Sequence, residues 1–236
     1  MSKIFLTGDT HHSRELFKKL SNKNFKQQKT LTKEDVVIIL GDVGALTWDK
    51  SKETLYNIEW LQDRNFTTLF IDGNHDNFDI LDNLPTKQIY GSEVGVLAKD
   101  IYHLKRGNIY TINGKTFLTI GGATSIDKEH RLPHRSWWER EVLSYSEIEN
   151  TCLSLEAVNY KVDYILTHTT FEDLGDQLVD GKVHGCKTSE FLSSIQDDLY
   201  FKGWFFGHFH KEKLFKSSKG FYQCLYNSVV DLVDFK

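Results

Sequence analysis

Short apolar runs alternate with stretches of helical periodicity along the first half of the chain. The pattern predicts strands at 3–7, 36–40 and 67–71 and helices at 14–20 and 52–64. Residues 36–40 are apolar at every position, which is typical of a buried strand. Strands that alternate with helices indicate βαβ units, so the pattern favours an α/β architecture.

After Pro85 the pattern changes to shorter strands. Asn113-Gly114 separates apolar runs at 109–112 and 116–120, and this dipeptide favours a two-residue hairpin turn. The remaining elements are predicted at 146–160 (helix), 162–166 (strand), 188–196 (helix), 204–206 (strand) and 213–233 (meandering strands around a turn at 217–220). Parallel and antiparallel pairing in one chain predicts a mixed sheet or two packed sheets.

Length and composition are those of an ordinary globular protein. The 236 residues are 39% hydrophobic and 26% charged, and no linker, repeat or low-complexity tract divides them. We therefore expect a single domain over residues 1–236. The longest apolar run is too short to cross a bilayer, and the first residues lack the apolar stretch of a secretory signal. Three cysteines at irregular spacing fit a reducing compartment, so a cytoplasmic protein is expected.

The charge balance argues against a protein that attracts polyanions over its whole surface. The formal net charge is −4 at pH 7, which gives no general attraction to nucleic acid or to an anionic membrane. Lysines cluster between residues 18 and 33, and a solvated loop is the favoured interpretation of that stretch. Nucleic acid stays open only as a partner bound through a local patch, and the sequence does not indicate an oligomeric state.

Polar side chains that can bind metals follow five of the predicted strands. They occur in Gly8-Asp9-Thr10-His11, Gly41-Asp42, Gly73-Asn74-His75-Asp76, Thr167-His168 and Gly207-His208-Phe209-His210. Ligand sites in open α/β sheets form beyond the carboxyl ends of the strands, so these clusters are predicted to converge on one crevice. Glycine before four of the five clusters supplies the backbone freedom that a tight strand-to-loop turn needs.

The residue types in these clusters indicate a pair of metal ions. Residues two apart on an extended segment point to the same side, which would let Asp9 act with His11 and His208 with His210. Carboxylate, imidazole and amide ligands without thiolate suit Mn, Fe or Zn. About seven such ligands suffice for two ions that share a bridging carboxylate, and Asp42 is the predicted bridge.

Each cluster alone has a simpler interpretation. A single Asp or Asn after a strand is usually a helix cap or a turn former. The remaining histidines, His12, His103, His130 and His184, are expected to be surface or hydrogen-bonded residues rather than ligands. Five clusters in order, each after a predicted strand, favour the metal site over these separate roles.

Taken together, the clusters resemble the motifs of the calcineurin-like metallophosphoesterase superfamily. Asp-x-His, Gly-Asp, Gly-Asn-His-Asp, a single His and Gly-His-x-His occur in that order from Asp9 to His210. The resemblance implies an α/β fold of two packed mixed β-sheets flanked by helices, a four-layer sandwich. It also implies a dinuclear site in which Asp9, His11 and His210 bind one metal, Asn74, His168 and His208 bind the other, and Asp42 lies between them.

The resemblance further implies that His75 is catalytic and that Asp76 is its orienting partner. The second motif continues as Val43-Gly44-Ala45-Leu46 without the second Asp of many members, which weighs against a protein Ser/Thr phosphatase. The third motif ends in Asp, as in the phosphodiesterase and nuclease branches. His12 stands where Gly often occurs, and sequence variation is favoured there over a substrate contact.

These features predict a metal-dependent phosphoesterase that acts on a small phosphodiester or phosphomonoester. Two divalent or trivalent ions, with manganese preferred to iron or zinc, would hold a bridging hydroxide that attacks phosphorus. His75 would protonate the leaving alkoxide as a general acid. A nuclease acting on DNA or RNA, a protein Ser/Thr phosphatase and a catalytically silent scaffold are the alternatives, and the intact ligand set speaks against the scaffold.

Substrate contacts are predicted in the segment 121–138. Arg131, His134 and Arg135 beside a pair of tryptophans combine phosphate-binding groups with flat apolar surfaces, a mixture suited to a nucleotide or another phosphorylated ligand. Tryptophans that anchor a surface loop, with solvated arginines, would explain the same residues equally well. The distinction depends on whether the segment folds over the metal site.

Overall fold

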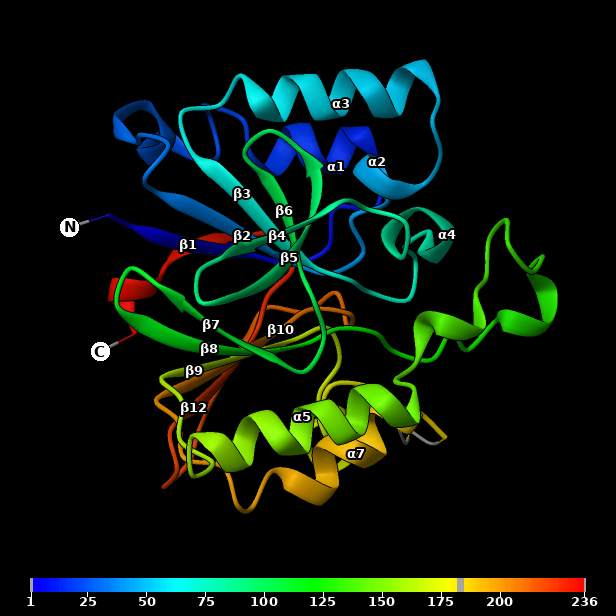
Figure 1. The fold of residues 1–236 in the computed structure, drawn as a ribbon, viewed down its shortest axis with the longest axis vertical. Coiled ribbons are helices and arrows are strands. Elements are labelled where there is room, and N and C mark those ends of the chain that lie inside the picture. The colour runs from blue at the N-terminus through cyan, green and yellow to red at the C-terminus, as the bar shows by residue number, and fades with distance from the viewer. Residues whose placement is uncertain (1, 182–184, 236) are drawn as a thin grey trace.

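Two β-sheets packed face to face form the centre of the molecule in the computed structural model, which describes residues 2–181 and 185–235. Helices cover the outer face of each sheet, so the layers follow the order helix, sheet, sheet, helix (Figure 1). Both sheets contain parallel and antiparallel strand pairs. The predicted fold class, two packed mixed sheets flanked by helices, is confirmed.

The first sheet is built mainly from the N-terminal half of the chain. Its strands among the described residues are, in spatial order, β13 (Val229–Asp231), β1 (Ile4–Thr7), β2 (Val36–Leu40), β3 (Thr67–Ile71), β6 (Ile101–Leu104), β5 (Ser92–Ala98) and β4 (Thr86–Ile89). Strands β1, β2, β3 and β6 are parallel neighbours. Their carboxyl ends therefore lie along the same edge of the sheet.

The second sheet is built from the C-terminal half. Its strands among the described residues are, in spatial order, β11 (Lys213–Lys216), β12 (Phe221–Cys224), β10 (Gly203–Phe206), β9 (Tyr164–Thr167), β8 (Lys115–Ile120) and β7 (Asn108–Ile112). Strands β12, β10, β9 and β8 are parallel, and β11 and β7 close the two sides in antiparallel pairing. This sheet also gathers the carboxyl ends of its central strands at one edge.

Four longer helices of the described residues form the outer layers. Helices α1 (Ser13–Lys19) and α3 (Lys52–Gln62) lie over the first sheet, and α5 (Tyr145–Ala157) and α7 (Lys187–Ile195) lie over the second (Figure 1). A serine caps the start of α3 and of α5, and the cap of α5 is a full capping box with Glu147. The shorter elements are α2 (Gly44–Thr47), α4 (Phe78–Leu81), α6 (Glu172–Gly175) and 3₁₀ turns at Lys26–Thr30, Lys128–His130, Glu139–Glu141 and Leu232–Asp234.

Alternate residues of the central strands face different cores. Leu6 of β1 packs in the core between the sheets, together with Phe205 of β10. Its neighbour Phe5 packs in the core beneath the first helical layer, together with Leu16 of α1. Trp204 belongs to the third core, under α5 and α7. Burial on both faces explains why the central strands appear in the sequence as continuous apolar runs.

The predicted hairpin is present, but the tail differs from its prediction. Asn113 and Gly114 have φ angles of 50° and 73° between β7 and β8, as a two-residue turn with two positive φ angles requires. In the tail, β11 and β12 form a hairpin, whereas β12 pairs in parallel with β10, and β13 crosses to the other sheet and pairs with β1. Alternation identifies these strands without showing which sheet each one joins.

The surface features expected from composition can be compared with the described residues. Within 2–181 and 185–235, each helix is too short or too polar to pass through a bilayer. In the lysine-rich stretch, Lys23, Lys26 and Lys29 are exposed to solvent, as predicted. Lys19 is buried instead, and its ammonium group donates to the backbone carbonyl of Asp9.

A buried ion pair lies behind the ends of the parallel strands. Arg106 Nη2 is 2.6 Å from Asp72 Oδ2, and the Arg106 side chain is 3% exposed. His103 Nε2 is 3.0 Å from the other oxygen of Asp72. Burial alone would raise the pKa of Asp72, but Arg106 and His103 hold it well below its usual range. The carboxylate is therefore kept charged by its two partners.

Replacing Arg106 by methionine is expected to lower the free energy of unfolding by about 3–5 kcal/mol, because Asp72 would stay buried without its main counter-charge. Denaturant unfolding at neutral pH measures this loss. Arg140→Met is the matched control, since the Arg140 side chain is 40% exposed in its pairs with Asp82 and Glu147. Surface pairs of this kind contribute about 0–1 kcal/mol. Equal losses in the two variants would contradict the prediction.

Candidate metal centre

The polar clusters that follow β1, β2, β3, β9 and β10 meet at one end of the sandwich. Strands β1–β3 are parallel neighbours in the first sheet, and β9 and β10 are parallel neighbours in the second, so each sheet brings its loops to one edge. A cleft of about 630 Å³ opens there, and its lining includes Asp42, Asn74, His75, His208 and His210. The structure thus gathers residues from loops far apart in the sequence.

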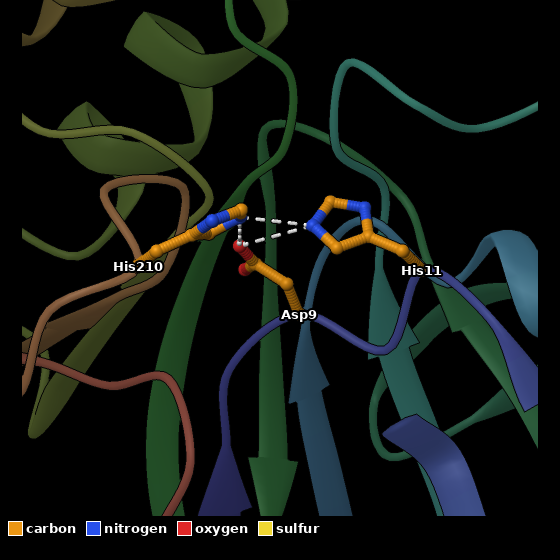
Figure 2. Close-up of side chains that lie close together, drawn as sticks. All are labelled: Asp9, His11 and His210. Carbon is orange, nitrogen blue, oxygen red and sulfur yellow. Dashed lines mark hydrogen bonds and ion pairs between the residues drawn. The ribbon is translucent and has the colours of Figure 1, made fainter. Parts of the chain in front are cut away.

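Asp9, His11 and His210 form the first group of candidate ligands (Figure 2). His11 Nε2 and His210 Nε2 are 2.9 Å apart, and they lie 3.8 Å and 3.1 Å from Asp9 Oδ2. Asp9 is fully buried, and its other oxygen accepts a hydrogen bond from the His208 backbone N–H at 3.1 Å. One ligand atom from each of the three residues lies within 4.8 Å of the others, so the group can hold a single ion.

Asn74, His168 and His208 form the second group. His168 Nε2 is 3.1 Å from Asn74 Oδ1, and the ring centroids of His168 and His208 are 5.1 Å apart. His168 is fully buried, and its Nδ1 donates to the backbone carbonyl of Leu40 at 2.7 Å. Because Nδ1 makes this bond, Nε2 is the nitrogen left to face Asn74 and Asp42, as in many metal-binding histidines.

Asp42 lies between the two groups. Its Oδ2 is 3.5 Å from His11 Nδ1, and its Oδ1 is 3.4 Å from His168 Nε2. Oδ1 also accepts the His75 backbone N–H at 2.7 Å, which fixes the carboxylate. The Asp42 backbone has φ = 50°, a left-handed conformation that is uncommon for residues other than glycine. The Asp42 carboxylate therefore lies close to one residue of each group.

The buried carboxylates give this site a strong preference for positive charge. Burial alone would lower the pKa of His168, but Asp42 and Asp9 raise it to about 10. Burial lowers the pKa of His208 to about 4, and repulsion from His168 adds to this shift. The hydrogen bond to Asp9 also raises the pKa of His210, so imidazolium groups balance the carboxylates in the protein alone. A bound cation would take over that role and release the protons, because a ligating imidazole must be neutral on the coordinating nitrogen.

Glycine permits the close approach of these loops, as Gly41 and Gly73 illustrate. A Cβ atom at Gly41, where φ is 91°, would lie 2.3 Å from His168 Nδ1. A Cβ atom at Gly73 would lie 2.2 Å from Asp42 Oδ1. A side chain at either position would push a candidate ligand out of place, which is the physical reason for glycine before these clusters.

The cluster after β10 has a backbone conformation that the sequence pattern does not predict. Alternation predicts an extended segment with both histidines on one side, but His208 and His210 have φ angles of 65° and 52°. The segment is a turn that directs His208 to the second group and His210 to the first. Left-handed conformations of non-glycine residues are strained, and such strain concentrates at functional sites.

The side chains of the two groups fit metal ions. Within the described part of the chain, Asp9 Oδ2 is a buried carboxylate oxygen without a hydrogen bond of good geometry. His210 Nε2 lies 3.1 Å from this oxygen, and a metal ion held by both residues would satisfy the buried charge. The donors around it are imidazole, carboxylate and amide groups, a set that suits Mn, Fe or Zn.

A protein-family model described as calcineurin-like phosphoesterase matches residues 2–212. The chain belongs to this family. It is a metal-dependent phosphoric ester hydrolase, since members of the family act with two metal ions. The predicted family is confirmed, and the match covers every candidate ligand from Asp9 to His210.

Solved structures share this phosphoesterase fold at low sequence identity. The phosphopantetheinyl hydrolase of Mycobacterium tuberculosis aligns with a TM-score of 0.51 and 15% identity over 95% of this chain and 89% of its own. A putative 5′-nucleotidase of Staphylococcus aureus aligns with a TM-score of 0.53 and 13% identity over 97% of this chain and 50% of its own, so this chain spans half of that protein. At such identities the likeness shows the fold alone. No curated protein sequence matches the chain.

His75 and Arg131 lie together in the cleft of this phosphoesterase. Arg131 Nη1 is 2.8 Å from His75 Nδ1, and Arg131 Nη2 is 3.3 Å from His75 Nε2. Burial lowers the pKa of His75, the Asp42 carboxylate opposes that shift, and the charge of Arg131 adds to it. The segment 121–138, which carries Arg131, therefore does reach the candidate metal site.

The family resemblance implies that Asp76 orients His75, but the hydrogen bonds of the Asp76 carboxylate go to other groups. Within the described residues, its Oδ2 accepts the Gly73 N–H at 2.7 Å, and its Oδ1 accepts the Thr47 hydroxyl at 2.8 Å. Burial and repulsion from Asp42 raise the pKa of Asp76 to about 7. Asp76 thus braces the turn that carries His75, whereas the nitrogens of the His75 ring face an arginine.

The other predicted substrate residues lie outside the cleft. His134 Nδ1 is 3.0 Å from Asp79, and the His134 side chain is 76% exposed. Arg135 is exposed on the same segment and does not line the cleft. Trp138 is buried, and its Nε1 donates to Asp79 at 2.8 Å. Each interpretation of this segment is therefore correct in part: Trp138 anchors the segment, and Arg131 reaches the site.

The remaining histidines are hydrogen-bonded, exposed or outside the described residues, and the ring centroid of His12 lies 6.2 Å from that of the candidate ligand His11. His103 is hydrogen-bonded to Asp72 at 3.0 Å. His12 and His130 are exposed. His184 lies outside the described residues.

The sequence did not indicate the side chains that pack against the candidate ligands. Tyr226 stacks on the His210 ring at 4.4 Å with an interplanar angle of 14°, and the ammonium group of Lys19 lies 4.5 Å from the Tyr226 ring centroid. Glu212 Oε1 accepts the backbone N–H groups of residues 226, 227 and 228, which fixes the loop that carries Tyr226. No local pattern marks these residues, because each contact joins segments that are distant in sequence.

Proposed function

We propose that this phosphoesterase hydrolyses a small phosphodiester or phosphomonoester at a dinuclear metal centre, with His75 as general acid. The observation that supports the proposal is the meeting of candidate ligands from both sheets in one cleft that also contains His75 and Arg131. We assign one ion to Asp9, His11 and His210, the other to Asn74, His168 and His208, and Asp42 to both.

The ions, when bound, would supply Lewis acidity, which lowers the pKa of water for attack on phosphorus and offsets the charge of the phosphoryl oxygens. Manganese is the expected metal, with iron or zinc as alternatives, because the donor set lacks thiolate. The remaining roles fall to side chains of the chain itself.

Arg131 is placed to hold the phosphoryl group. Its guanidinium lines the cleft, its side chain is 15% exposed, and Asp127 fixes it through a contact of 2.7 Å. A guanidinium can donate two parallel hydrogen bonds to phosphoryl oxygens. A bound phosphoryl group would compete with His75 for this arginine and so free the imidazole.

His75 is placed to serve the leaving group. Water first loses a proton to the solvent. As the bond from the resulting hydroxide to phosphorus forms, the bond from phosphorus to the alkoxide breaks, and a protonated His75 passes its proton to the departing oxygen, which leaves as the alcohol. The His75 backbone N–H is bonded to Asp42, so the residue keeps a fixed position relative to the candidate bridging carboxylate. A phosphoryl group that draws Arg131 away leaves both ring nitrogens free to carry that proton.

Replacing Arg131 by alanine is expected to raise KM by about 10–100-fold, because hydrogen bonds to a charged group contribute about 1.5–3 kcal/mol. Steady-state kinetics with a phosphoester substrate measure the change. Arg135→Ala is the matched comparison, since Arg135 is exposed on the same segment and lies outside the cleft. An Arg131 variant whose KM equals that of the unaltered protein would remove Arg131 from the proposed site.

A metal-dependence assay tests the proposed function as a whole. The protein is stripped with a chelator, reloaded separately with Mn, Fe or Zn, and assayed with p-nitrophenyl phosphate and bis(p-nitrophenyl) phosphate. Activity should vanish on stripping and return on reloading, and the ratio of the two rates would separate monoesterase from diesterase. A protein that binds two metal ions yet cleaves neither class of ester would contradict the hydrolytic role, and salt-sensitive cleavage of DNA would favour a nuclease.

We also infer that residues 1–236 form one domain and act in the cytoplasm. The first sheet contains β1 and β13, strands from opposite ends of the chain, which supports a single folding unit. The three cysteines are free thiols, two of them buried, which supports a reducing compartment.

A further inference from the structure

A buried chain of hydrogen bonds runs from Asn74 away from the cleft. Asn74 Nδ2 donates to Ser125 Oγ at 3.0 Å, and Ser125 Oγ donates to Glu141 Oε2 at 2.6 Å. The Ser125 backbone N–H donates to the other oxygen of Glu141 at 2.9 Å. The exposed fractions of Asn74, Ser125 and Glu141 are 3%, 3% and 2%, so water has little access to replace any of these bonds.

The chain of hydrogen bonds has a fixed direction. A carboxylate can only accept hydrogen bonds, so the Ser125 hydroxyl uses its single hydrogen in the bond to Glu141. Ser125 Oγ then has only lone pairs left for its neighbour, and the group of Asn74 that can face it is the amide nitrogen. The amide oxygen is thereby turned the other way, toward His168 Nε2 at 3.1 Å. Only this orientation offers an oxygen to a cation, because an amide NH₂ group donates and cannot coordinate.

Ser125 and Glu141 also flank the segment 126–140, and the hydrogen bonds between them hold its two ends together. Residues 126–140 project from the body of the molecule beside α4 (Figure 1), and Arg131 within this segment contacts His75 at 2.8 Å. The Glu141 backbone carbonyl accepts from Arg106 at 3.3 Å, which ties the base of this segment to the buried ion pair. Ser125 thus contacts a candidate ligand, and its bonds to Glu141 hold the segment that reaches the cleft.

We propose that Ser125 and Glu141 are positioning residues that fix the Asn74 amide with its oxygen toward the second metal ion. The inference rests on the proposed function in one respect, the assignment of Asn74 as a ligand. It assigns a role to two residues that do not touch the metal, and it explains why a carboxylate is buried at the base of a projecting segment.

The test is a metal titration of the unaltered protein and of Ser125→Ala, Ser125→Thr and Glu141→Gln, with Mn²⁺ as the probe. Ser125→Ala should weaken one of two binding events by about 10–100-fold, the range expected for loss of a residue that orients a ligand, and leave the other unchanged. Ser125→Thr keeps the hydroxyl and should restore the affinity. In Glu141→Gln the new side-chain amide can donate to Ser125 Oγ. The Ser125 hydroxyl is then free to donate to the Asn74 oxygen, which allows the Asn74 amide to be reversed. This variant should therefore weaken the same metal-binding event.

Controls separate positioning from general damage. Ser193→Ala removes a part-buried hydroxyl of α7 that bonds to Glu172 and Ser189, and it should leave both metal affinities unchanged. A merely structural role would lower the unfolding temperature of the Ser125→Ala protein without changing one affinity selectively. If Ser125→Ala does not fold, the titration of Glu141→Gln decides the question.

The outcomes distinguish this inference from the proposed function. An unaltered protein that fails to bind two metal ions would overturn the dinuclear centre itself. Two binding events that are identical in the unaltered protein, Ser125→Ala and Glu141→Gln would leave the centre intact and overturn the positioning role.

Discussion

The Asp42→Asn variant is expected to lose turnover by about 10³-fold or more and to retain at most one metal ion per chain. The two oxygens of Asp42 lie near both groups of candidate ligands, at 3.5 Å from His11 Nδ1 and 3.4 Å from His168 Nε2. Loss of metal removes several kcal/mol of charge stabilisation in the transition state, and each 1.36 kcal/mol corresponds to about tenfold in rate. Elemental analysis of the purified variant and an ester hydrolysis assay measure the two effects.

The substitution preserves shape and removes charge, so it isolates the electrostatic role of the carboxylate. Asp42 is the main group that raises the pKa of His168, and the neutral amide would no longer favour a cation at that position. Asp163→Asn is the matched control, because Asp163 pairs with Lys202 and the loss of that pair leaves the cleft residues untouched. Full metal content and normal turnover in the Asp42→Asn protein would show that Asp42 bridges nothing.

The His75→Ala variant is expected to bind both metal ions and to lose about 10²–10⁴-fold in turnover on an alkyl phosphoester. An alkoxide leaves poorly without a proton, whereas p-nitrophenolate leaves readily. The loss should therefore be much smaller on p-nitrophenyl esters. Parallel assays with the two kinds of leaving group, after the metal content has been equalised, measure the difference.

His130→Ala serves as the control for His75, since His130 is exposed on the projecting segment. An equal loss on both kinds of ester would assign His75 to phosphate binding rather than proton transfer. An unchanged rate on the alkyl ester would remove it from the reaction.

The sequence predicted the elements of the fold well wherever burial alone determines the pattern. The strands predicted at 36–40 and 67–71 have the observed bounds of β2 and β3, because every side chain in them is buried. The crossing of β13 to the first sheet could not be predicted, since its three residues show no feature that selects one sheet over the other. Strand patterns describe local burial, and pairing between distant strands depends on the whole chain.

The same distinction applies to the metal centre. Asp9 and Asp42 could be singled out because they follow recognisable strands, and in the structure both lie close to His11. The turn geometry of His208 and His210 could not be predicted from the sequence, because a short Gly-His-Phe-His segment fits an extended strand equally well. The contact between Arg131 and His75 joins residues 56 positions apart, and no local pattern specifies such a pair.

The stacking of Tyr226 on His210 bears on how the chain can be shortened. The family match ends at residue 212, a boundary that already contains every candidate ligand. The residues beyond it supply Tyr226, which stacks on His210, and two strands, β12 beside β10 and β13 beside β1. A fragment cut at the end of the matched region would keep all the reactive groups and lose strands from both sheets, so recombinant versions of this hydrolase should retain the tail.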